Sequence, residues 1–221
     1  MKKSSIFLSA AFFAAVLFSA CTPKECVECK ECDLEHVTPP VEKEGGVIIN
    51  GVCWAKCNVG AFRTFVSKPT DYGMLYQWNR QTAYDNTTTG AVTGWDNTLP
   101  EGEVWAKAND PSPDGWRVPT AAEIATLLQK DKVKNEWVEE IDGVFGCRFT
   151  DLSTNKSIFL PAAGCRYGSD GALDGVGTFG YYWLNTDPGG DNAYDLHFRG
   201  NGVVLSGDGK VNGFSVRPVA E

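Results

Sequence analysis

Short runs of alternating apolar and polar residues dominate the C-terminal three quarters of the chain. In the segment AYDLHF, which ends at Phe198, the side chains of Tyr194, Leu196 and Phe198 share one face. Period-two alternation is typical of a strand with one buried face. The pattern therefore predicts that these three residues face a core and that Asp195 and His197 face solvent.

Two further runs predict buried strands. FGCRF places Cys147 on one face between two phenylalanines, and the apolar run SIFL ends at Leu160 before a proline. Asp-Gly pairs predict turns; they begin at Asp114, Asp142, Asp170, Asp174 and Asp208. Strands and turns at this density indicate a β-rich domain.

One segment has helical periodicity instead. Thr120 is a natural N-cap, and Glu123 three residues later completes a capping box. Ile124, Leu127 and Leu128 then form an apolar stripe. We expect one capped helix here, with an architectural role.

The N-terminus has the pattern of an export signal. Lys2 and Lys3 precede the apolar run 6–20, which is too short for the roughly 20 residues that cross a bilayer. The following Ser-Ala-Cys resembles a lipoprotein cleavage site, although Phe18 replaces the usual leucine. We expect a signal peptide over 1–20 and diacylglycerol on Cys21, which would anchor the chain firmly in a membrane. An ordinary cysteine after a plain cleavage site is the alternative.

Residues 21–46 are predicted to be a disordered, cysteine-rich tether, because they are charged and contain prolines. Cys26, Cys29 and Cys32, with His36, could bind zinc or an iron–sulfur cluster. Export to an oxidising compartment favours disulfides instead, and an odd number of tail cysteines favours one to a neighbouring chain.

The remaining segment, 47–221, has the length of one domain. The formal net charge of the whole chain is −8, with 20 Lys and Arg against 28 Asp and Glu. Because nucleic-acid binding requires clustered basic residues, we expect no nucleic-acid partner.

Six stretches, in this order, resemble the Fibrobacter succinogenes major paralogous domain: GVCWAKCNVGA, DYGMLYQWNR, DGWRVPTAAEIATLL, FLPAAGCRYGSDGAL, GTFGYYWLNT and GFSVRPVAE. That family is similar to the sulfatase-modifying-factor and C-type-lectin-like folds. The resemblance covers residues 46–221 and implies a single compact α+β domain, C-type-lectin-like, β-rich, with one main capped helix and long loops. It also implies an exported lipoprotein.

Two positions where the family often has cysteines hold Ser112 and Pro218. Cys147 and Cys165 stand where it more often has other residues, and we expect them to form a substitute disulfide, worth about 3 kcal/mol in the chain-entropy model. Cys53 and Cys57 are either a second pair or two buried thiols.

Enzymatic activity is not expected. A formylglycine-generating oxidase needs a close, reactive cysteine pair in its C-terminal half, and the last cysteine here is Cys165. A serine triad needs a histidine base, and His197, the only histidine of the domain, is predicted on an outward face. The oxidase remains a less favoured alternative.

Two loops are candidate ligand sites. In the polar segment 85–100, Trp95 is followed by Asp96 and Asn97, a combination that suits sugars because the ring stacks and the polar groups bind hydroxyls. Alternatively, Trp95 folds back over the core. Near the C-terminus, a second group of oxygen ligands could hold calcium or form a turn: Asn185, Asp187, Asp191 and Asn192. No other cofactor is expected.

Together these patterns predict a lipoprotein of the outer membrane, exposed at the cell surface, whose lectin-like domain binds an extracellular glycan or protein. A structural, fimbrial-type surface subunit is the alternative. Such a subunit should expose a strand edge or a large apolar surface.

Overall fold

The computed structural model describes residues 40–140 and 142–221. The predicted signal peptide, Cys21 and the tail cysteines Cys26, Cys29 and Cys32 lie outside these residues. Within them, no helix is long and apolar enough to cross a membrane.

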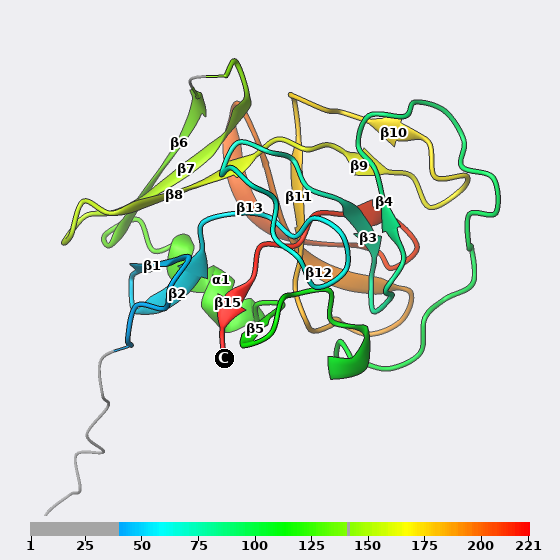
Figure 1. Ribbon diagram of the computed structural model, residues 1–221, viewed down its shortest axis with the longest axis horizontal. Coiled ribbons are helices and arrows are strands. Elements are labelled where there is room, and N and C mark those ends of the chain that lie inside the picture. Colours follow the sequence, from blue (N-terminus) through cyan, green and yellow to red (C-terminus); the bar gives the residue numbers. More distant parts are fainter. Residues whose placement is uncertain (1–39, 141) are drawn as a thin grey trace, which may run out of the picture. The chain divides into compact units, whose positions relative to one another are not determined.

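Four antiparallel sheets make up the described part (Figure 1). The first has the order β1 (Gly46–Ile49), β2 (Val52–Ala55), β15 (Val219–Ala220) and β5 (Trp116–Arg117). The second has the order β10 (Leu173–Asp174), β9 (Cys165–Arg166), β14 (Gly213–Phe214), β3 (Leu75–Gln77) and β4 (Ala83–Tyr84). The third consists of β11 (Gly180–Trp183), β12 (Asn192–Arg199) and β13 (Gly202–Gly209), and the fourth of β6 (Val133–Glu139), β7 (Phe145–Asp151) and β8 (Ser157–Pro161). The expected β-rich domain is confirmed.

The helix α1 (Ala121–Leu127) forms where the capping box predicts it. Glu123 N donates to Thr120 Oγ1 at 3.2 Å, and Thr120 N donates to Glu123 Oε2 at 2.8 Å. Ile124 and Leu127 are buried in the main core beside residues of β1 and β2. A second helical turn, η1 (Lys107–Asn109), is a short 3₁₀ segment.

The core has two large clusters. The main cluster joins α1 to the β1–β2 hairpin, to β6–β8 and to one face of β12 through Leu196 and Phe198. The second cluster lies on the other face of β12, where Ala193 packs with Trp183 and Phe214. Strand β12 is therefore covered on both faces.

This double coverage corrects the prediction for the polar face of β12. Asp195 is 0% exposed, and His197 is half-buried. The His197 ring stacks on Tyr181 with centroids 4.4 Å apart, and Tyr181 stacks in turn on Phe214 at 4.7 Å. Alternation identified the face of Leu196 and Phe198 correctly but wrongly predicted that the opposite face meets solvent.

The predicted disulfide between Cys147 and Cys165 is not formed; both are free, buried thiols. Cys147 lies in β7 opposite Leu160 of β8 and belongs to the main core, whereas Cys165 belongs to the second cluster. The chain leaves the β6–β7–β8 sheet after Pro161 and enters a different sheet at Cys165, so the two cysteines are not neighbours. Cys53 and Cys57 are also free, so these two do not form a pair.

The turn prediction is wrong at Asp208, and Asp174 is itself the last residue of β10, with the turn beginning at Gly175. Asp208 and Gly209 are the last residues of β13, where they pair with the start of β12. The predicted buried strand that ends at Leu160 is confirmed as β8.

Candidate functional site

A hollow of about 610 Å³ lies between η1, β5 and the segment that follows β11. Trp105 and Trp116 form its apolar walls, and Ser112 and Asn185 contribute polar groups. We call it the Trp105 pocket. Its volume falls within the range of about 300–1,000 Å³ that is usual for small-molecule sites.

Three residues that line this pocket each carry a buried side-chain atom with no hydrogen-bond partner among the described residues: Trp105 Nε1, Ser112 Oγ and Asn185 Oδ1. Trp105 is only 6% exposed and Ser112 only 5%. Leaving a buried donor or acceptor unpaired costs about 1–3 kcal/mol, so most buried polar groups in proteins are paired. Of the eleven such atoms among the described residues, three thus belong to residues of one hollow.

The backbone holds these three residues in place. Trp105 N donates to Asn185 O at 2.7 Å, and Asn185 N donates to Pro119 O at 2.9 Å. Ser112 N donates to Asp110 Oδ1 at 2.8 Å. The unpartnered atoms are therefore presented by fixed segments, which lowers the entropy that a ligand would have to remove on binding.

The charges around the pocket are balanced. Three cations, Arg63, Lys107 and Arg117, line it together with three carboxylates, Asp110, Asp114 and Glu221. Lys107 Nζ lies 3.0 Å from Glu221 Oε1. The pocket therefore offers no excess charge of either sign.

Arg117 at the pocket wall is fixed by helix α1. Its two terminal nitrogens donate to the carboxylate of Glu123 at 2.9 and 2.6 Å. Burial alone would raise the pKa of Glu123, but hydrogen bonds from Arg117 and Thr120 outweigh it and the pKa is lowered. The capping box thus also orients a side chain of the pocket.

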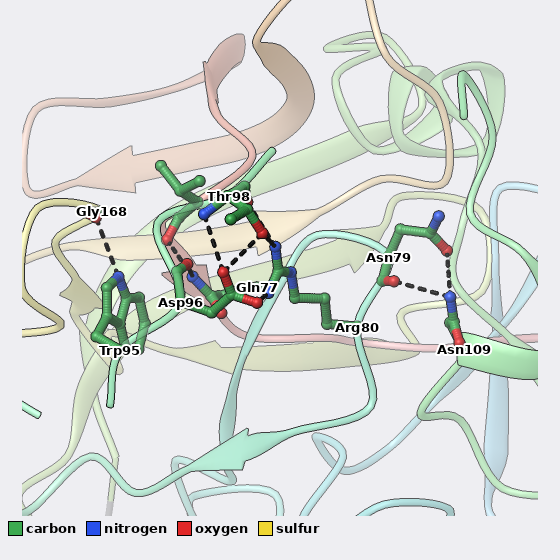
Figure 2. Close-up of polar contacts among 9 residues, drawn as sticks. Gln77, Asn79, Arg80, Trp95, Asp96, Thr98, Asn109 and Gly168 are labelled. Carbon is green, nitrogen blue, oxygen red and sulfur yellow. Dashed lines mark hydrogen bonds and ion pairs between the residues drawn. The ribbon is translucent and has the colours of Figure 1, made fainter. Parts of the chain in front are cut away.

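The sequence-predicted sugar site, in the segment 85–100 that follows β4, does not line the Trp105 pocket (Figure 2). Trp95 is half-buried: its Nε1 donates to Gly168 O at 3.0 Å, and its ring packs on Tyr84 with centroids 4.5 Å apart. The alternative, in which Trp95 folds back against the domain, describes its position.

Asp96 and Asn97 are also engaged internally. The Asp96 carboxylate pairs with Arg80 and accepts from Thr98 N at 2.9 Å (Figure 2). Asn97 Nδ2 donates to Ser169 O at 3.1 Å. All three predicted residues thus hold this loop together, and ligand binding there stays a prediction.

The four predicted calcium ligands have different surroundings, and calcium binding by them stays a prediction. Asp187 Oδ2 pairs with Lys210 Nζ at 2.6 Å, and Asp187 Oδ1 accepts from Gly189 N. Asp191 and Asn192 are exposed, whereas Asn185 lines the Trp105 pocket. No group of three or more His, Cys, Asp or Glu residues suited to a metal ion occurs in 40–140 and 142–221. A calcium ion at Asp187 would have to displace the Lys210 ammonium.

The buried cysteines are unsuited to thiolate chemistry. Burial raises the pKa of Cys147 and that of Cys165 to about 12, and it also raises the pKa of the half-buried Cys57. Because the thiolate is the nucleophile, these three thiols are unreactive at neutral pH.

Comparisons with known proteins add no identification: no family model, no curated protein and no solved structure matches the chain. The Trp105 pocket was missed by sequence reasoning, which considered Ser112 only as a departure from a family pattern. No local pattern links Trp105, Ser112 and Asn185, because their proximity depends on the fold.

Proposed function

We propose that this chain is an exported lipoprotein whose C-type-lectin-like domain binds an uncharged saccharide in the Trp105 pocket. The observation that carries the proposal is the set of three unpartnered polar atoms at one preformed hollow. The proposal keeps the glycan ligand expected from the sequence but assigns it to the Trp105 pocket instead of the loop at Trp95.

The chemistry of the three atoms matches hydroxyl groups. Trp105 Nε1 can only donate, Asn185 Oδ1 can only accept, and Ser112 Oγ can do both. A sugar hydroxyl also donates and accepts, so adjacent hydroxyls can satisfy all three atoms. An ionised carboxylate, which only accepts hydrogen bonds, would leave Asn185 Oδ1 without a donor.

Shape and charge support the same ligand class. Trp105 and Trp116, each 6% exposed, contribute apolar edges beside the polar groups, and the balanced charges favour a neutral molecule. Export and lipid attachment at Cys21, as the sequence predicts, would bring the pocket to extracellular glycans at the outer membrane. None of these features requires catalysis.

A structural surface subunit is the second candidate. The eight-residue strand β13 lies at the edge of its sheet, and Val204 and Leu205 on it are exposed. Unprotected edge strands pair readily with other chains. A protein that binds no glycan but self-associates through this edge would favour this candidate.

The test uses the full-length protein, purified in detergent, on an array of neutral and charged glycans, followed by calorimetric titration with the best neutral ligand. Trp105→Phe replaces the indole with a smaller phenyl ring and removes the N–H, and should weaken binding by at least about tenfold, the effect of one buried hydrogen bond. Trp95→Phe is the matched control, because it removes the same N–H from a ring outside the pocket, and it should leave the affinity unchanged. Absence of binding to any neutral glycan, or equal affinity in the Trp105→Phe variant, would overturn the proposal.

A further inference from the structure

A second hollow, of about 600 Å³, lies where the β6–β7 hairpin meets the β12–β13 turn and the segment before β11. Its aromatic wall consists of Trp137, Phe145 and Phe179, and Arg199 and Asn201 contribute polar groups. A smaller hollow of about 260 Å³ shares Trp137, Arg199 and Asn201 with it. We call the two together the Trp137 groove.

The aromatic wall is partly exposed to solvent. The rings of Trp137 and Phe145 are nearly parallel, with 11° between their planes and 6.1 Å between their centroids. Phe145 is 37% exposed although it lies in a strand. Trp137 is held from behind by an edge contact with the buried Phe198. Two nearly parallel rings, of which Trp137 is supported from behind, give the hollow an aromatic platform against which a sugar ring can stack.

Arg199 is the charged residue of the groove. Its Nε donates to Asn201 Oδ1 at 2.8 Å, which orients the guanidinium. No Asp or Glu lines either hollow, and none of the ion pairs among the described residues involves Arg199. In a chain with a net charge of −8, an arginine without a carboxylate partner is notable. A guanidinium binds carboxylates through two parallel hydrogen bonds, so Arg199 is available to bind a carboxylate in the groove.

We infer that the Trp137 groove is a second binding site, specific for an acidic sugar residue such as a glycuronate or a sialate. The sugar ring stacks on Trp137 and Phe145, and its carboxylate pairs with Arg199. The site shares no residue with the Trp105 pocket and differs from it in charge, so the inference does not depend on the neutral ligand proposed there.

A peptide ligand fits these features less well. A carboxylate fixed on the rim of a rigid ring can reach Arg199 while the ring lies flat on the platform. An acidic peptide side chain supplies the charge but no flat apolar face beside it. The combination of platform and guanidinium therefore favours the acidic sugar.

The experiment titrates the full-length protein in detergent with methyl glucuronide, methyl glucoside and N-acetylneuraminic acid, and follows tryptophan fluorescence and calorimetry. We expect at least one of the two acids to bind about tenfold or more tightly than the glucoside, with an affinity that falls as salt rises. Arg199→Gln should abolish this preference, and Arg199→Lys should restore part of it. Lys130→Gln, which removes an exposed positive charge elsewhere, is the matched control and should leave binding unchanged.

Two variants separate this site from the Trp105 pocket. Trp137→Phe should weaken binding of the acidic sugar and leave neutral saccharide binding unchanged, whereas Trp105→Phe should do the opposite. The inference is overturned if neither acid binds more tightly than the glucoside, or if Arg199→Gln leaves the preference intact. Arg199-dependent binding of an acidic peptide without binding of either acid would overturn the assignment to a sugar.

Discussion

The Trp105 pocket and the loop around Trp95 have similar compositions and opposite hydrogen-bonding states. Each has a tryptophan beside amide, hydroxyl and carboxylate groups. In the loop, Trp95 Nε1 and the Asp96 carboxylate are paired within the domain. In the pocket, Trp105 Nε1 and Ser112 Oγ have no partner among the described residues.

This difference shows how to distinguish a polar loop that stabilises itself from one that binds a ligand. Composition cannot do so, because the same residue types serve both purposes. Unpaired hydrogen-bonding groups at a hollow can make this distinction, because those groups have already been removed from water on folding and a ligand need not desolvate them again. Substitutions in the loop should therefore reduce stability, whereas those in the pocket should reduce binding.

The largest expected effect is on stability, at Trp95. Trp95→Ala removes the ring contact with Tyr84 and leaves Gly168 O without its donor. Because Trp95 is half-buried, we expect a loss of about 3 kcal/mol, the lower end for large-to-small substitutions in cores. Urea unfolding measures this loss, and calorimetry should show an unchanged affinity for the neutral saccharide. Lost binding with unchanged stability would reverse the roles assigned to the two regions.

The second prediction tests whether unpartnered atoms alone mark a site. Both carboxylate oxygens of Asp195 lack a partner, yet Asp195 lines none of the hollows described above. Burial, and next the nearby Asp208 carboxylate, raise the pKa of Asp195 to about 8. With this pKa, Asp195 is mostly protonated at neutral pH. Its carboxyl O–H can then donate a hydrogen bond to the Asp208 carboxylate, which gives Asp195 a partner without any ligand.

This arrangement gives a defined pH dependence. In the unfolded chain the pKa of Asp195 is about 4, so the folded state binds the extra proton and stability falls as pH rises towards 8. The pKa of His197 is lowered, so His197 makes stability rise with pH, and it does so below pH 7. The effect of Asp195 is therefore best measured between pH 7 and pH 9. The melting temperature of the wild type should fall across this window by at least about 3 °C more than that of Asp195→Asn.

The difference between the two proteins isolates Asp195. The raised pKa values of the buried Cys147 and Cys165 also make stability fall as pH rises in this window, but they do so equally in the wild type and in Asp195→Asn. Asp191→Asn, at an exposed carboxylate of the same region, is the control and should melt like the wild type. Parallel melting curves for wild type and Asp195→Asn would mean that Asp195 is ionised in the fold.

Local signals account for what the sequence predicted correctly. The capping box of Thr120 and Glu123 acts over three residues, and the apolar run of β8 needs only its own composition. Predictions that depended on distant segments were wrong. Asp195 and His197 alternate like solvent-facing residues, but Tyr181 and Phe214 cover their side of β12.

Dependence on distant segments also explains why the sequence did not reveal the Trp105 pocket. Trp105, Ser112 and Asn185 meet because the segments before β5 and after β11 are brought together by backbone hydrogen bonds. Cys147 and Cys165 are closer in sequence but enter different sheets. The departure from the family's cysteine pattern thus predicted a disulfide that is not formed, and no local pattern could predict the pocket.

The smallest expected effect on stability is the one that tests the comparison most sharply. Ser112→Ala removes a hydroxyl that is buried and unpartnered, so the variant loses no hydrogen bond and no longer buries an unpaired polar group. Its free energy of unfolding should equal that of the wild type or exceed it by up to about 1 kcal/mol. Binding of the neutral saccharide should nevertheless weaken several-fold.

Thr98→Ala is the matched control in the loop, because it removes a hydroxyl that donates to Asp96 at 2.7 Å, and it should lower stability and leave binding unchanged. If Ser112→Ala proved clearly destabilising, the Ser112 hydroxyl of the wild type would have a hydrogen-bond partner within the fold. The pocket and the loop would then not differ in hydrogen bonding at this residue.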